Sequence, residues 1–173
     1  GEPVPLARIF VLGDSSMPMA GDTPAAITDE IGRFRATDVP LGPCRIFAVH
    51  DGHAPSASSP LVVDRDVVDL VVTLKAGARL EGRVIDAHGA VVAHAIVQAA
   101  ANDGWYSRQT VSGSDGAFRL DGLSRSFFRV RADSALGASA TAVVDLDTVD
   151  SQSIVLNLLR SWSIAGIVVD DEG

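Results

Sequence analysis

Histidines and clustered carboxylates are the residues of this chain best suited to hold a metal ion. His50 and His53 lie three positions apart, and imidazole is a common zinc ligand, but an extended or turn segment need not bring two such side chains together. Carboxylate oxygens suit Ca²⁺, yet none of the acidic clusters has the spacing of an EF-hand or another known calcium loop. We therefore predict no metal site and interpret the acidic clusters as solvated loop charge. These clusters lie at 64–66, 145–150 and 170–172.

An apolar stretch ends in Gly-Asp-Ser at residues 13–15, which resembles the nucleophile block of GDSL (SGNH) hydrolases. A serine nucleophile needs a histidine base and groups that stabilise the oxyanion. That family supplies them through Gly-x-Asn-Asp and a late Asp-x-x-His. Here Asn102 and Asp103 lack the preceding glycine, and the chain has no Asp-x-x-His. We predict that Ser15 is not a nucleophile, that the chain has no catalytic residue, and that it is not an enzyme.

Trp105 and Tyr106 form an aromatic pair directly after the turn residues at 102–104. Paired aromatic rings at a loop edge can stack on a sugar or a peptide. Successive side chains of a strand point to opposite faces, so only one of the two rings can face a core. Trp105 and Tyr106 are therefore our predicted ligand-binding residues. The alternative is that they pack under a loop.

The bulk composition excludes several classes of protein. A 47% share of hydrophobic residues predicts a packed core, and a net charge of −8 opposes binding to the phosphates of nucleic acid. No stretch approaches the roughly 20 apolar residues of a membrane span, so we expect no membrane span. Cys44 is the only cysteine and Lys75 the only lysine. The first fact rules out an internal disulfide, and the second is typical of a GC-rich bacterial source.

The chain contains an internal repeat. Residues 82–89 and 166–173 both read Gly-x-Val-x-Asp-x-x-Gly. The segment after Gly89 also matches the segment after Gly1, which makes Gly1, Gly89 and Gly173 equivalent positions. Further matches at a spacing of 84 residues join 31–35 to 115–119 and 70–74 to 154–158.

Apolar residues of the second period alternate with period two, and turn residues interrupt them every 8 to 12 positions. This pattern is typical of β-sandwiches, and no segment has the apolar stripe of a helix. Asp86 to Gly89 and the segments 102–104 and 114–116 supply the turns. We predict seven strands, at about 79–86, 94–101, 105–112, 116–120, 127–132, 138–145 and 152–159.

These motifs resemble those of the carboxypeptidase regulatory-like domain, a member of the transthyretin or prealbumin-like sandwiches. The family pattern runs Gly-x-Val-x-Asp-x-x-Gly, Ala-x-Val, Thr-Asp-x-x-Gly-x-Phe and Leu-Pro-x-Gly-x-Tyr. The last motif is incomplete, because Cys44 and Phe128 stand where tyrosine is usual. The matching segments are 7–9, 28–34 and 39–42 in the first repeat and 82–89, 95–97 and 115–118 in the second.

The resemblance implies an all-β fold of tandem seven-stranded Greek-key β-sandwiches, transthyretin or prealbumin-like. We predict that residues 1–76 form a first repeat without its first strand, that 77–161 form a complete second repeat, and that 162–173 supply the first strand of a third. Gly1 resembles an internal cut. The spare strand at 162–170 is then expected to fill the gap in another copy, as in donor-strand or domain-swapped assembly.

The function that follows is a non-catalytic structural or protein-interaction β-sandwich repeat of a larger secreted or cell-surface bacterial protein. Its expected location is extracellular, at the cell surface or periplasmic. Its expected partners are neighbouring repeats or another protein, including a strand-exchanged copy of itself, with no nucleic acid and no cofactor. The alternative is a carbohydrate- or peptide-binding module that uses the loop around Trp105.

Overall fold

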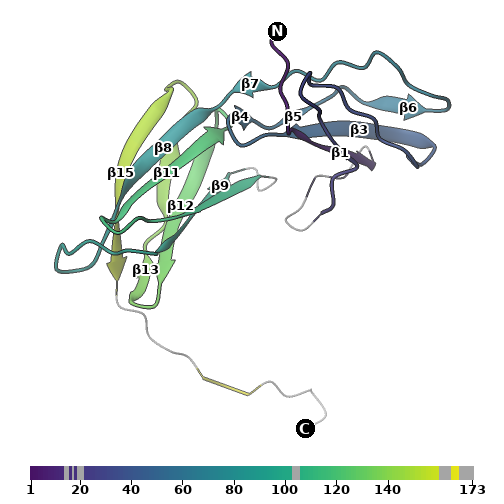
Figure 1. Ribbon diagram of the computed structural model, residues 1–173. Helices are drawn as coiled ribbons and strands as arrows, with labels where there is room; N and C mark the ends of the chain where they lie inside the picture. The colour runs from purple at the N-terminus through teal and green to yellow at the C-terminus, as the bar shows by residue number, and fades with distance from the viewer. Residues whose placement is uncertain (14–15, 17, 19–21, 103–105, 160–164, 168–173) are drawn as a thin grey trace.

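In a computed structural model, the chain is all-β: its described residues form fifteen strands and no helix. The strands gather in two groups, and the short strands β4 (His53–Ala54) and β7 (Lys75–Ala76) pair with each other between them (Figure 1). The all-β class predicted from the alternating apolar pattern is confirmed. The structure describes residues 1–13, 16, 18, 22–102, 106–159 and 165–167.

The first group is a five-stranded antiparallel sheet built around β1 (Arg8–Gly13). β1 pairs with β2 (Ala26–Ile27) on one side and with β3 (Gly42–Val49) on the other. The opposite edge of β3 pairs with β5 (Ser56–Ala57) and β6 (Leu61–Val63). This sheet therefore consists of two long strands and three short ones.

The second group is an eight-stranded sheet in the order β10-β9-β12-β13-β15-β8-β11, with β14 paired to β12. Neighbouring strands in this sheet are antiparallel, except that β15 and β8 run parallel. β13 pairs with both β12 and β15 and joins the two layers of a sandwich. The strands are β8 (Ala78–Ile85), β9 (Ile96–Ala101), β10 (Ser107–Val111), β11 (Ala117–Leu123), β12 (Phe127–Ser134), β13 (Gly137–Ser139), β14 (Ala142–Asp145) and β15 (Ser151–Leu159).

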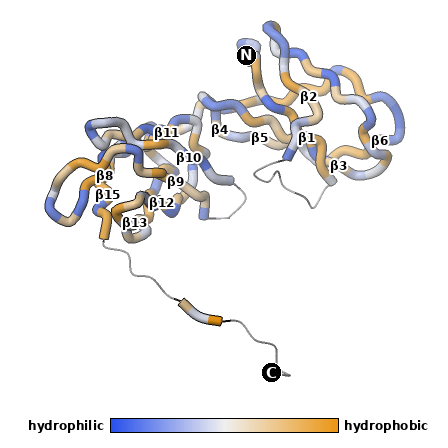
Figure 2. Tube along the Cα trace, turned by 60° about the horizontal axis from the view of Figure 1, so that its bottom comes forward, coloured by the Kyte–Doolittle hydropathy of each residue, from blue (hydrophilic) through white to orange (hydrophobic). Residues whose placement is uncertain are grey.

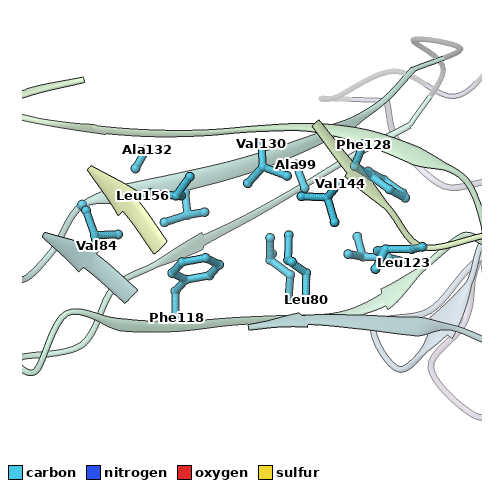
Figure 3. Close-up of a cluster of buried hydrophobic side chains, with 14 of the residues drawn as sticks. Leu80, Val84, Ala99, Phe118, Leu123, Phe128, Val130, Ala132, Val144 and Leu156 are labelled. Atoms are coloured by element: carbon cyan, nitrogen blue, oxygen red, sulfur yellow. The ribbon is translucent and has the colours of Figure 1, made fainter. Parts of the chain in front are cut away.

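The core of the second group lies between these two layers (Figure 3). Side chains of β9, β12 and β14 face those of β8, β11 and β15, as alternation along each strand requires. Leu80, Val84, Phe128 and Val130 are completely buried. Burying one such side chain stabilises the fold by roughly 1.5 to 3 kcal/mol, so this core is the main source of the group's stability.

The strand expected at 138–145 is divided into β13 and β14. Ser139 marks the break: its buried Oγ accepts the backbone N–H of Ala132 at 2.9 Å and donates to the carbonyl of Ala140 at 2.9 Å. A side-chain hydroxyl thus takes a hydrogen bond that the ladder would otherwise make. The break lets β13 turn toward β15 while β14 stays on β12.

Strand pairing in the two groups has the same register. Arg8 pairs with Ile27 and Val49 in the first group, and Ile96 pairs with Val111 and Asp133 in the second. The whole β1 and β3 ladder, from Arg8↔Val49 to Gly13↔Cys44, maps onto the β9 and β12 ladder, from Ile96↔Asp133 to Ala101↔Phe128. These offsets agree with those of the repeat predicted from the sequence.

A buried hydroxyl occupies the same place in both groups. Thr28 accepts the N–H of Ala7 at 2.8 Å and donates to the Val4 carbonyl at 2.7 Å. Ser112 accepts the N–H of Ala95 at 2.9 Å and donates to the Val92 carbonyl at 2.8 Å. The residues before the two alanines, Leu6 and His94, both have positive φ, at 59° and 57°.

The second layer of the first group lacks strands. Residues 33–39 and 64–74 correspond to β11 and to the region of β15, and all of them are described, but none belongs to a strand. Phe34, Leu70 and Val72 still pack against the core of the first sheet. The first group is therefore one paired sheet covered by extended, unpaired chain.

Candidate functional site

Of the aromatic pair predicted to bind a ligand, only the second member, Tyr106, is described, and it lies directly before β10. Trp105 lies outside the described residues. The Tyr106 side chain is buried, meets the Phe128 ring edge-on at 6.4 Å, and donates its hydroxyl to the Gly122 carbonyl at 3.0 Å. Burial raises the pKa of Tyr106, which keeps the hydroxyl protonated as a donor. The Tyr106 side chain therefore packs in the core of this structure, and a binding role for Trp105 and Tyr106 stays a prediction.

Arg108 links Tyr106 to the first group of strands. It lies two positions along β10 on the same face, and its Nε donates to the Tyr106 hydroxyl while its guanidinium covers the ring at 5.6 Å. Its terminal nitrogens donate to a carboxylate oxygen of Asp51 and to the His50 carbonyl, both at 2.6 Å. Only 14% of this side chain is exposed. One arginine thus joins two segments 57 residues apart in the sequence.

Backbone packs directly on backbone beside this arginine. A Cβ atom on Gly77 would lie 2.4 Å from the Cα of Gly122, and one on Gly122 would lie 2.5 Å from the Asp51 carbonyl oxygen. Gly122 also has φ +69°, in a region that favours glycine, at a bulge of β11 between Leu120 and Leu123. The β4 and β7 pair therefore touches the bulge without intervening side chains.

An open groove runs along this contact and is lined by charged side chains that pair with one another. Asp121 accepts from Arg119 at 2.6 Å and from Arg79 at 2.8 Å, and the hydrogen bond from Arg119 is the main cause of its lowered pKa. Arg125 pairs with Asp150 at the far end. The opposite charges offset each other, so the groove favours neither an anion nor a cation.

The histidine pair lies at the same junction, where residues 50–54 and 75–77 contact β10 and β11. His50 Nδ1 accepts the N–H of Gly52 at 3.1 Å and lies 2.9 Å from Nδ1 of His53, so the two rings do come together. Burial, followed by the nearby His53, lowers the pKa of His50. No group of three or more residues able to ligate a metal occurs in the described part of the chain.

The remaining candidates do not come together as a site. Ser15 and the acidic residues 170–172 lie outside the described part of the chain. Asp145 accepts the N–H of Asp147 within its own loop, and Asp64 pairs with its exposed neighbour Arg65. The described residues also contain no helix long and apolar enough to cross a bilayer.

The motifs of the predicted family have turn-forming roles in the structure. Asp86 accepts the N–H groups of His88 and Ala90 through one carboxylate oxygen, at 2.8 and 2.9 Å, and Gly89 has φ +81°. These bonds lower the pKa of Asp86. Phe118 lies over Gly82, where a Cβ atom would come within 2.9 Å of its ring. Asp86 and Gly89 therefore form the turn after β8, and Gly82 leaves room for the ring of Phe118 in the core.

A family model, the carboxypeptidase regulatory-like domain, matches residues 79–158. This range coincides with the second group of strands. Residues 79–158 belong to the carboxypeptidase regulatory-like domain family. The resemblance predicted from the motifs is confirmed for this domain. No curated protein matches the chain.

Several solved pilin structures resemble the chain at low identity. Shaft pilin SpaA from Lactobacillus rhamnosus GG is 14% identical with a TM-score of 0.41, over 97% of this chain and 91% of that one. The minor pilin GBS52 of Streptococcus agalactiae is 11% identical with a TM-score of 0.44, over 96% and 89% of the two chains. The major pilin BcpA of Bacillus cereus is 10% identical with a TM-score of 0.42, over 89% and 55%.

No sequence motif marks the residues that join the two groups of strands. Arg108 belongs to no motif, and no sequence pattern marks Asp51 or Gly122 as contact residues. One signal was available, because Tyr106 and Arg108 are two positions apart and must share a face of their strand. Their partner on the first group was not visible in the sequence, since the pairing depends on how the two groups meet.

Proposed function

We propose that this chain is a non-catalytic structural or protein-interaction segment of a larger secreted or cell-surface bacterial protein, in which β-sandwich repeats follow one another. The observation that supports this proposal is the contact between the two groups of strands. Arg108, Tyr106 and the contact of Gly77 with Gly122 hold the carboxypeptidase regulatory-like domain against the preceding strands. Such a buried, backbone-to-backbone joint suits a rigid spacer.

The repeat organisation is part of this proposal, with boundaries at residues 1–76, 77–161 and 162–173. It is supported by the shared register of the two groups and by the matching hydroxyls of Thr28 and Ser112. Neighbouring repeats, or another protein, are the proposed partners. The proposed location, outside the cytoplasm, is tested by fractionating cells that express the tagged parent protein. Its appearance only in the cytoplasm would contradict that location.

The rigid joint is tested by nuclear magnetic relaxation, which reports the rotational correlation time of each group of strands. In the dilute wild-type chain we expect both groups to tumble with one correlation time. Arg108→Ala should separate the two values, because it removes the bonds to Asp51 and His50. Arg131→Ala is the matched control, since this exposed arginine pairs only with Asp133 of its own strand in the described structure. Different correlation times in the wild type would overturn the spacer proposal.

A further inference from the structure

One turn, at residues 50–53, supplies both acceptors through which Arg108 joins the two groups of strands. The His50 carbonyl closes this turn by accepting the backbone N–H of His53 at 3.3 Å. Arg108 of β10 donates to the same carbonyl and to the carboxylate of Asp51, the next residue of the turn. Figure 2 shows β4, which begins at His53, at the place where the two groups of strands meet. The conformation of this turn therefore determines where both acceptors lie.

An imidazole holds this turn where other turns of the chain use a carboxylate. Nδ1 of His50 accepts the N–H of Gly52 at 3.1 Å, which requires that this nitrogen carries no proton. The same bond, to the N–H two residues further on, is made at 2.8 to 3.1 Å by Asp29, Asp86, Asp115 and Asp145. A carboxylate remains an acceptor down to about pH 4, whereas an imidazole gains a proton near pH 6.5. Mild acid therefore acts on the His50 turn and leaves the aspartate turns unchanged.

The second histidine of the turn strengthens this requirement. Nδ1 of His53 lies 2.9 Å from Nδ1 of His50, and His53 is the donor because His50 already accepts from Gly52. A proton added to His50 would preserve this contact if His53 changed tautomer and became the acceptor. The Gly52 N–H has no such choice, because a backbone amide nitrogen only donates. Protonation of His50 therefore leaves two N–H groups pointing at each other and breaks the turn.

We propose that protonation of His50 loosens the joint, so that the two groups of strands are held rigidly at neutral pH and move separately in mild acid. The inference rests on the rigid joint proposed above and adds its regulation. When the turn opens, the His50 carbonyl and the Asp51 carboxylate leave their positions beside Arg108, and the joint loses both of these hydrogen bonds. The His50 and His53 side chains are half-buried, so protons from solvent reach them.

The charges around His50 fit a change that takes place below neutral pH. Titratable or charged side chains on this turn and on the elements around it are Asp51, His53, Arg8 of β1, Lys75 of β7, Arg108 of β10, and Arg119 and Asp121 of β11. Asp51 favours the protonated form of His50, whereas Arg108 and Arg8, which pair with Asp51, oppose it. Burial, followed by the nearby His53, lowers the pKa of His50. A histidine whose pKa is lowered in the joined state stabilises that state above its ordinary pKa of about 6.5 and loses this contribution as the pH falls.

Nitrogen chemical shifts of the two imidazole rings test the hydrogen bonds directly. At neutral pH we expect His50 to carry its proton on Nε2 and His53 to carry its proton on Nδ1. A proton on Nδ1 of His50 at neutral pH would overturn the inference, since that nitrogen could not then accept from Gly52.

The main experiment follows the rotational correlation times of the two groups of strands as the pH is lowered from about 7.5 to about 5, a range in which imidazole titrates and aspartate does not. We expect one common value at the upper end and two shorter, different values at the lower end. His50→Asn should keep one value throughout, because the asparagine oxygen accepts the Gly52 N–H without titrating. His94→Asn is the matched control, since exposed His94 lies in the second group at a positive φ that asparagine tolerates, and it should behave like the wild type.

The outcomes separate this inference from the spacer proposal. A wild-type chain that keeps one correlation time at about pH 5 would overturn the inference and leave the spacer proposal standing, and so would a His50→Asn chain that separates like the wild type. Resonances of the buried Leu80 and Val130 should persist over this range; their loss would also overturn the inference, since acid would then unfold the domain rather than open the joint. Different correlation times already at neutral pH would refute the spacer and its regulation together.

Discussion

Replacing Ser112 with alanine should destabilise the carboxypeptidase regulatory-like domain more than the loss of one hydroxyl suggests. The Ser112 side chain is 2% exposed, and its Oγ serves the N–H of Ala95 and the carbonyl of Val92 at once. Alanine would leave both backbone groups buried without a partner. Each such group costs about 1 to 3 kcal/mol, so for the two groups together we expect the free energy of unfolding to fall by about 2 to 6 kcal/mol.

Urea denaturation followed by circular dichroism measures this change. With a slope near 2 kcal/mol per molar, the urea midpoint of the domain should fall by about 1 to 3 M. Ser153→Ala is the matched control, since Ser153 is exposed on β15 and its replacement should alter stability by less than about 0.5 kcal/mol. A Ser112→Ala midpoint indistinguishable from that of Ser153→Ala would refute the reasoning.

Three further predictions concern the junction and the core. Gly122→Ala should lower the thermal midpoint, because a Cβ atom would press on the Asp51 carbonyl and φ +69° disfavours alanine; an unchanged midpoint would contradict this. The Arg108 hydrogen bond lowers the pKa of Asp51, so its stabilisation is present above about pH 4 and lost below it. The urea midpoints of wild type and Asp51→Asn should therefore converge in acid, and a constant difference would refute the linkage. Leu80→Ala should cost about 2 to 5 kcal/mol in urea denaturation, since Leu80 is fully buried, whereas a loss below about 1 kcal/mol would mean that the core closes over the cavity.

Local patterns in the sequence determined most strands of the second group. Alternating apolar residues placed β8, β9 and β12 within two residues of their observed bounds, and Asp86 with Gly89 marked the turn after β8. These features depend on residues that are close in the chain. A period of two is enough to divide a strand into a buried and an exposed face, whatever the strand pairs with.

Tertiary structure decided whether a strand-like segment became a strand. Residues 33–39 and 70–74 have the same alternation as β11 and β15, yet they are unpaired. A strand exists only when a neighbour accepts its backbone hydrogen bonds, and no described strand takes the place of β8 beside them. Ser139 likewise divided the strand expected at 138–145, because its hydroxyl bonds to backbone groups.

The junction also belongs to the tertiary structure alone. Composition and motifs correctly placed the chain among all-β proteins and identified the family of residues 79–158. They could not show that Arg108 meets Asp51 or that Gly77 touches Gly122, because those pairs are 57 and 45 residues apart. Local sequence patterns determined the strands and turns within each group. The contact of two folded surfaces, which no local pattern encodes, determined how they are joined.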